Sequence, residues 1–172
     1  MPDTWLAGED ITADKLNQRR PFLITAKALA SNATSVSSTT LQTIMTTDTV
    51  TLKSGRAFEF KIRGLIQHAT TSATGLCRFN LAFNSSGNGI RTLGAIPVYN
   101  GTSASRNNWV ELTYAAINGS GSDITDAVVL SYAQEPGESK TFTFAANSTH
   151  VAHLEVWDIG PASDFPSYFE LT

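Results

Sequence analysis

The sequence predicts an all-β fold: an antiparallel β-sandwich or jelly roll of about eight to ten strands, with a short N-terminal arm. From Phe22 onward, apolar residues recur at every second position in a series of short segments, and this is the period of a β-strand. Turn-forming pairs such as Asn88-Gly89 and Pro136-Gly137 separate these segments. Charged residues make up only 16% of the chain, and Thr, Ser, Asn and Gly are common instead. This composition is typical of strands joined by polar turns.

The first segment, residues 1–21, differs from the rest of the chain. Thr12 can cap a short helix that runs to about Gln18, and Ile11 and Leu16 stand where a hydrophobic staple forms. A helix this short is marginal unless it lies on a surface. We therefore predict an N-terminal anchoring arm over residues 1–21 and a β-sandwich domain over residues 22–172. The predicted anchors are the apolar residues of the arm: Trp5, Leu6, Ile11 and Leu16.

The clearest predicted strand covers residues 58–66. Its apolar residues alternate with charged ones, so Phe60 and Ile62 are expected to face a core while Lys61 faces water. The apolar stretch after Pro161 is expected to dock on its own domain or on a neighbour, and the polar residues 31–40 predict a loop or a weak edge strand. In the first strand, one face is predicted from Phe22, Ile24, Ala26 and Ala28. Further strands are predicted over residues 77–83, 90–98, 110–114, 128–132, 141–145 and 151–157.

The composition also limits the classes of partner. Acidic residues outnumber basic ones by 15 to 12, whereas phosphate binding requires concentrated Lys and Arg, so we expect no nucleic-acid partner. No apolar run approaches the roughly 20 residues of a membrane-spanning helix, and the N-terminus lacks the basic and apolar regions of a signal peptide. We therefore expect no membrane partner and synthesis in a cytoplasm. The single cysteine, Cys77, lies in an alternating apolar run, where a buried thiol is expected.

No group of residues predicts catalysis. His150 and His153 are three apart in a predicted strand and would point to opposite faces, so they cannot chelate one ion by themselves. Asp123 and Asp126 lie near glycines, but the D-x-D-x-D-G spacing of a calcium loop is missing. No serine lies in a G-x-S-x-G elbow, and no Ser, His and Asp set has a spacing that indicates a triad. We expect no catalytic residue, no cofactor and no metal, and hence a protein that is not an enzyme.

Two tryptophans of the predicted domain are candidates for a surface role. Trp109 and Trp157 could stack on sugars, although a tryptophan that covers the sheet or an interface is the simpler interpretation. Trp157 shares its predicted face with His153 and Glu155, so it is expected to be exposed or to lie at a subunit contact. The candidates for an oligomer or ligand surface are Trp109, Trp157, Phe165, Tyr168 and Phe169.

Short segments at both ends and in the middle of the chain resemble known proteins. The opening WLAGEDITADKLN, residues 5–17, resembles the W-x-x-G-E-x-I/V-T-A-x-x-L-N start of tailed-phage virion proteins, which include head fibres, decoration proteins and tail appendages. The closing LEVWDIGP, residues 154–161, resembles a V-x-D-I-G-P strand of small actinobacteriophage structural proteins that are often labelled minor tail proteins. The strand entry Gly55-Arg56-Ala57-Phe58 belongs to the same resemblance.

This resemblance implies a component of the virion exterior, with an N-terminal anchor on the particle and a β-sandwich head that is commonly trimeric. Neither a long coiled coil nor a collagen-like shaft lies between the arm and the domain, so a compact capsid decoration protein is expected rather than an extended fibre. The partners it implies are the phage major capsid protein or a tail protein, and further copies of the chain in a homotrimer. The alternatives are a minor tail protein and a carbohydrate-binding module that contacts a glycan of the host cell surface.

Overall fold

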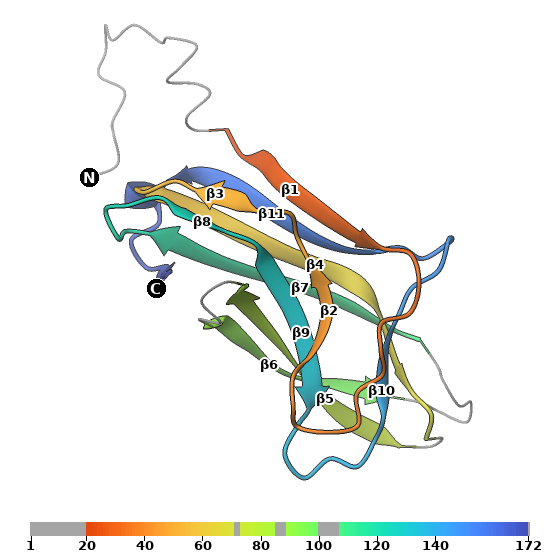
Figure 1. Cartoon of the computed structure of the whole chain (residues 1–172). Coiled ribbons are helices and arrows are strands. Elements are labelled where there is room, and N and C mark those ends of the chain that lie inside the picture. Colours follow the sequence, from red (N-terminus) through yellow and green to blue (C-terminus); the bar gives the residue numbers. More distant parts are fainter. Residues whose placement is uncertain (1–19, 71–72, 85–88, 100–106, 172) are drawn as a thin grey trace, which may run out of the picture.

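The computed structural model describes residues 20–70, 73–84, 89–99 and 107–171. These residues form an all-β sandwich of a six-stranded and a four-stranded sheet with a further two-stranded ribbon, as predicted (Figure 1). Within the described ranges, the only helical segment is a 3₁₀ turn, η1 (Ala162–Asp164). All but the last two residues of the predicted arm lie outside the described residues.

The larger sheet has β4 at its centre. Its order is β1 (Phe22–Leu29), β11 (Ala152–Pro161), β4 (Arg56–His68), β7 (Asn108–Asn118) and β12 (Phe169–Glu170), and β10 (Phe142–Ala145) pairs with the last residues of β4. The smaller sheet has the order β2 (Gln42–Thr46), β9 (Val128–Gln134), β5 (Thr74–Phe83) and β6 (Gly89–Tyr99). The ribbon pairs β3 (Val50–Leu52) with β8 (Ile124–Asp126). Every pairing is antiparallel except that of β12 with β7.

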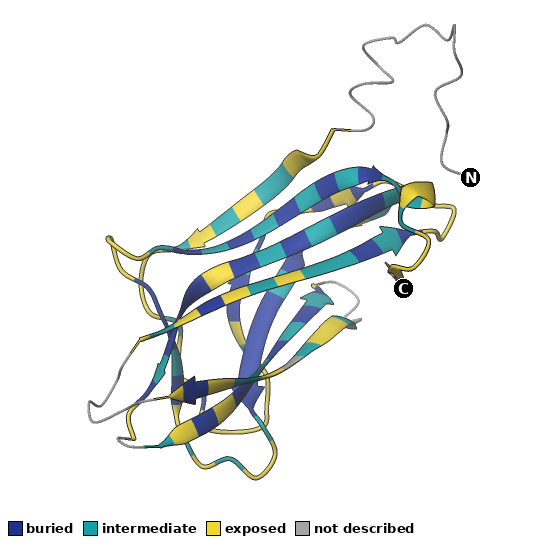
Figure 2. Ribbon diagram, turned by 180° about the vertical axis from the view of Figure 1, so that it is seen from behind, coloured by how far each residue is buried: buried dark blue, intermediate teal, exposed yellow. Residues whose placement is uncertain are grey.

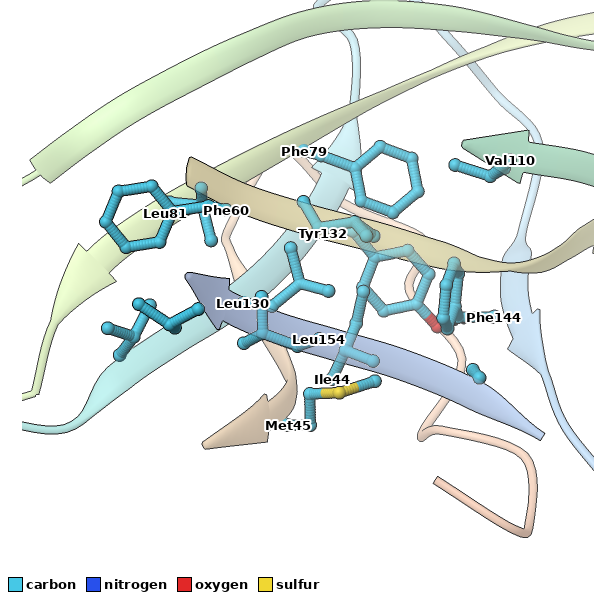
Figure 3. Packing of buried hydrophobic residues seen from close by; sticks show 14 of the residues in the cluster. Ile44, Met45, Phe60, Phe79, Leu81, Val110, Leu130, Tyr132, Phe144 and Leu154 are labelled. Atoms are coloured by element: carbon cyan, nitrogen blue, oxygen red, sulfur yellow. Dashed lines mark hydrogen bonds between the residues drawn. The ribbon is translucent and has the colours of Figure 1, made fainter. Parts of the chain in front are cut away.

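The hydrophobic core lies between the two sheets, whose strands cross at a steep angle (Figure 1). Phe79 of the smaller sheet packs on Tyr132 with ring centroids 6.2 Å apart and meets Phe144 edge-on at 5.7 Å. Figure 3 shows these three rings beside one another among the packed side chains. The Tyr132 hydroxyl donates a hydrogen bond of 2.8 Å to the carbonyl of Thr34, so the one polar atom of this ring is satisfied.

Strand β4 confirms the predicted alternation. Phe58, Phe60 and Ile62 are fully buried, whereas Lys61 lies on the outer face of the sheet. Residues 31–40 form the expected loop, with one isolated β-bridge between Val36 and Phe142. The bridge joins this loop to β10.

The first strand departs from its predicted pattern because a β-bulge interrupts its pairing with β11 between Leu23 and Thr25. Ile24, at the bulge, packs against the core. A shift of one residue exchanges the two faces of a strand, so beyond the bulge Ala26 pairs with Glu155 and is exposed on the outer face. The prediction that the apolar residues of this strand share one face is therefore wrong. The residues concerned are Phe22, Ile24, Ala26 and Ala28.

Candidate interaction surfaces

The two domain segments that carry the resemblance lie side by side in the larger sheet. The end of β11 pairs with the start of β4, Pro161 opposite Arg56 and Gly160 opposite Ala57. Arg56 donates from Nε to Asp158 Oδ2 at 2.9 Å and from Nη2 to Asp158 Oδ1 at 2.5 Å. The backbone N–H of Gly160 donates to the same Oδ1 at 3.0 Å. The segments Gly55–Phe58 and Leu154–Pro161 are thus one structural unit.

The geometry of this unit explains why it needs these residue types. A β-bulge follows Asp158, and Gly160 adopts a φ of +134°, a conformation that side chains with a Cβ rarely take. The Asp158 carboxylate is buried, and the planar guanidinium of Arg56 matches its two oxygens. The D-I-G-P motif therefore shapes the end of a strand.

Trp157 lies on the outer face of the larger sheet with His153 and Glu155, as predicted. Its indole Nε1 donates a hydrogen bond of 2.8 Å to Glu155, and the ammonium of Lys61 lies 5.2 Å from the ring centroid. Lys61 also forms an ion pair of 3.1 Å with Glu59. The ring is half-buried within a chain of contacts from its own sheet, so its polar atom and one of its faces are already occupied.

Trp109 is far more accessible, with 61% of its surface exposed. It lies near the start of β7 and pairs with Leu65 of β4. Two residues further along β7, Glu111 forms an exposed ion pair of 3.2 Å with Arg63. The two tryptophans, both candidates for a surface role, therefore differ: Trp109 presents an accessible aromatic surface, whereas Glu155 and Lys61 already contact Trp157.

The C-terminal segment docks on its own domain, which is one of the two expected outcomes. Leu171 is buried in the core, and its N–H donates to the carbonyl of Ile117 at 2.8 Å. Phe169 stacks on Tyr114 at 6.3 Å and lies 4.2 Å from the guanidinium of Arg91, which extends from β6 of the other sheet. Burial raises the pKa of the Tyr114 hydroxyl. These contacts close the side of the sandwich between β7 and β6.

Two candidate residues of this segment, Tyr168 and Phe169, are exposed. Phe165 is partly buried and stacks on Tyr168 with ring centroids 5.0 Å apart. Their assignment to an interface between copies stays a prediction. The anchors Trp5, Leu6, Ile11 and Leu16 lie outside the described residues.

The histidines and the cysteine are held apart from one another. His150 precedes β11, in a turn where the Asn147 side chain accepts its N–H at 2.9 Å, so the prediction that it belongs to the strand is wrong. His68 is buried, with Nε2 3.0 Å from the carbonyl of Val98. Burial raises the pKa of the Cys77 thiol to about 12. Among the described residues, no three His, Cys, Asp or Glu side chains are placed to hold a metal ion. No helix in the described ranges is long and apolar enough to cross a membrane.

Comparisons with known proteins give distant likenesses of architecture. No family model matches the sequence, and no curated protein matches it. A chain of T=1 particles derived from infectious bursal virus aligns over 84% of this chain and 41% of its own, with 9% identity and a TM-score of 0.44. The CBM22-1 xylan-binding domain of Paenibacillus barcinonensis Xyn10C aligns over 83% and 97%, with 7% identity and a TM-score of 0.39.

A chain of the infectious bursal disease virus VP2 subviral particle aligns over 85% of this chain and 43% of its own, with 10% identity and a TM-score of 0.35. The chain thus spans less than half the length of these viral chains. Likenesses this distant carry no argument about function.

Proposed function

We propose that this chain is a non-enzymatic structural protein of a phage virion, and that it decorates the capsid exterior through its N-terminal arm. The sequence resemblance at residues 5–17 supports this proposal, because those residues match the opening of virion proteins that attach to a particle. The related alternative is a minor tail protein that is anchored by its N-terminal arm in the same way.

The observation that carries the proposal is the extensive hydrophobic core that the described residues of the domain form among themselves. The core cluster of the described residues runs from Val36 to Leu171, with Ile24 and Leu29 packed against it. The sandwich therefore has its own source of stability. We assign the apolar residues of the arm to contact with the particle.

One arm alone would hold the protein weakly. Burying four apolar side chains offers about 6–12 kcal/mol at roughly 1.5–3 kcal/mol each, and the costs of association and of ordering the arm reduce this to a few kcal/mol. Three arms on one trimer would bind at a high effective concentration after the first has engaged, and this adds about 10²–10⁴ in apparent affinity. We therefore include a homotrimer in the proposal, with the phage major capsid protein as its partner.

A second candidate function rests on Trp109. An exposed indole beside the Arg63–Glu111 pair offers an apolar platform next to groups that bind hydroxyls, which is the chemistry a sugar ring requires. If the chain binds a carbohydrate of the host surface, wild-type protein should bind on a glycan array. Trp109→Ala should abolish this binding, and Trp157→Ala should not affect it. An array on which wild-type protein binds nothing would remove this candidate.

The test of the main proposal is decoration itself. Particles assembled without this protein are mixed with the purified full chain, sedimented and imaged by electron microscopy. We expect saturable binding and added density at fixed positions on the capsid exterior. Wild-type protein that stays in the supernatant at micromolar concentration would contradict the proposal, and density confined to the tail would favour the minor tail protein.

A further inference from the structure

The large exposed apolar side chains of the described residues gather at the two ends of the sandwich. At one end, which we call the base, β1 begins and β7 ends; the opposite end holds the start of β7 and the end of β6 (Figure 2). The base carries Phe22, Leu23, Tyr168 and Phe169. The opposite end carries Leu41, Leu76, Tyr99 and Trp109.

Several charged groups that border the base are engaged within the chain. Lys53 and Asp123, on the turns that border it, form an ion pair of 2.7 Å. The Glu170 carboxylate accepts the N–H of Gly119 at 3.0 Å. Arg20 and Asp164 are exposed, so the base offers a partner an apolar surface beside two accessible charges. Two of its aromatic residues are unusually accessible to water, Phe22 with 50% and Phe169 with 55% of the surface exposed.

The arm joins the domain at this same end, since Arg20 and Pro21 directly precede Phe22. A chain reaches at most about 3.6 Å per residue, so any pocket that holds Leu16 lies within roughly 20 Å of Phe22. The opposite end is farther away, because the 13 residues of β4 cover about 40 Å at the usual rise of a strand. A partner pocket that holds Leu16, the anchor nearest to the domain, therefore lies closer to the base than to the opposite end.

We propose that the base, through Phe22, Leu23 and the C-terminal aromatic residues, is a second contact with the same particle protein that binds the arm. This inference rests on the proposed function. The short connection makes the second contact intramolecular, with an effective concentration in the millimolar range, so a weak apolar contact adds measurably to affinity. The opposite end, with Trp109 and Tyr99, then points away from the particle.

Phe165, Tyr168 and Phe169 are also candidates for an interface between copies of the chain. The point at which the arm joins the domain favours the particle instead, because a particle bound through the arm lies close to this end whatever the number of copies. A second copy on the base would make the mass in solution depend on the same side chains. The experiment therefore measures both binding and mass.

The test compares two double variants of the full chain, matched for the loss of exposed apolar side chains at opposite ends. The base variant is Leu23→Ser with Tyr168→Ser, and the control is Tyr99→Ser with Trp109→Ser. Phe169 is left unchanged because it stacks on Tyr114. We expect the base variant to bind particles about 10- to 100-fold more weakly than wild type, and the control to bind as wild type does. Melting temperatures and the mass by light scattering are recorded for each protein.

The outcomes separate this inference from the proposed function. If wild-type protein and the base variant bind particles with equal affinity, the inference is wrong and the decoration role stands. A base variant of lower mass than wild type also overturns it, because a second copy would then occupy the base. Wild-type protein that does not bind refutes the decoration role and the inference with it. If the base variant has a lower melting temperature than wild type, the single substitution Leu23→Lys replaces it in the comparison, because Leu23 faces outward.

Discussion

The buried ion pair between Arg56 and Asp158 should make Asp158→Asn one of the most damaging conservative substitutions in the chain. The substitution keeps the shape of the side chain and an oxygen that can accept the N–H of Gly160, but it removes the charge that faces the guanidinium. Only 4% of the Asp158 side chain and 16% of the Arg56 side chain are accessible. Water can therefore replace little of what is lost.

The expected loss follows from this burial. Removing one partner of a buried pair typically costs about 3–5 kcal/mol, and the partial access of water to Arg56 sets our expectation at about 3 kcal/mol. For a chain of this size, roughly 2–4 °C per kcal/mol converts this to a fall in melting temperature of about 6–12 °C. The assay is urea denaturation followed by tryptophan fluorescence, with thermal melting as a second measurement.

The chain provides a matched control on the same strand. Arg63 and Glu111 form an Arg–carboxylate pair at 3.2 Å, with side chains that are 46% and 52% exposed. Exposed pairs contribute about 0–1 kcal/mol, so Glu111→Gln should cost less than 1 kcal/mol. Adding Arg56→Met to Asp158→Asn should recover part of the loss, because the unpaired charge is then removed. Equal losses for Asp158→Asn and Glu111→Gln would refute the reasoning.

Two further predictions concern the core. Phe60→Ala should lower the free energy of unfolding by about 3–5 kcal/mol, because Phe60 is fully buried against Tyr114. Lys61→Ala should lower it by at most about 1 kcal/mol. Similar melting temperatures for the two variants would show that the faces of β4 are misassigned. Burial raises the pKa of both Tyr132 and Cys77 to about 12, so the folded state keeps protons that the unfolded state has lost. The contribution of these two groups to stability should therefore be constant below about pH 9 and be lost as the pH rises towards 12. The fall should be smaller for Tyr132→Phe. The Cys77 thiol should not react with a thiol reagent at pH 8 until the protein unfolds.

The strands with clear alternation could be predicted from the sequence alone. Phe58–Ile66 repeats apolar and polar residues for long enough to fix both the element and its buried face. The short strands β2, β3, β8 and β12 were not predicted, because two to five residues carry too little periodicity to separate a strand from a loop. β2 and β12 pair with the longer strands β9 and β7, whereas β3 and β8 pair with each other.

Other features depend on contacts that no local pattern contains. The bulge at Ile24 exchanges the faces of β1, and only its pairing with β11 reveals it. The Arg56–Asp158 pair joins residues 102 positions apart, so the two motifs were recognised separately although they form one unit. The sequence also could not predict that Trp109 is accessible while Trp157 is in contact with Lys61, because both properties depend on neighbours from another strand. The gathering of Phe22 and Leu23 with Tyr168 at the base had no sequence signal.

Deleting residues 1–21 tests whether the arm alone anchors a sandwich that folds without it. The truncated protein, residues 22–172, is purified, its melting temperature and solution mass are measured, and it is mixed with particles that lack the native protein. We predict a folded protein of the same oligomeric state as the full chain that no longer decorates particles at concentrations where the full chain saturates them. A truncated protein that still decorates the particles, or one that is unfolded, would contradict the division of the chain into an anchoring arm and a self-sufficient sandwich.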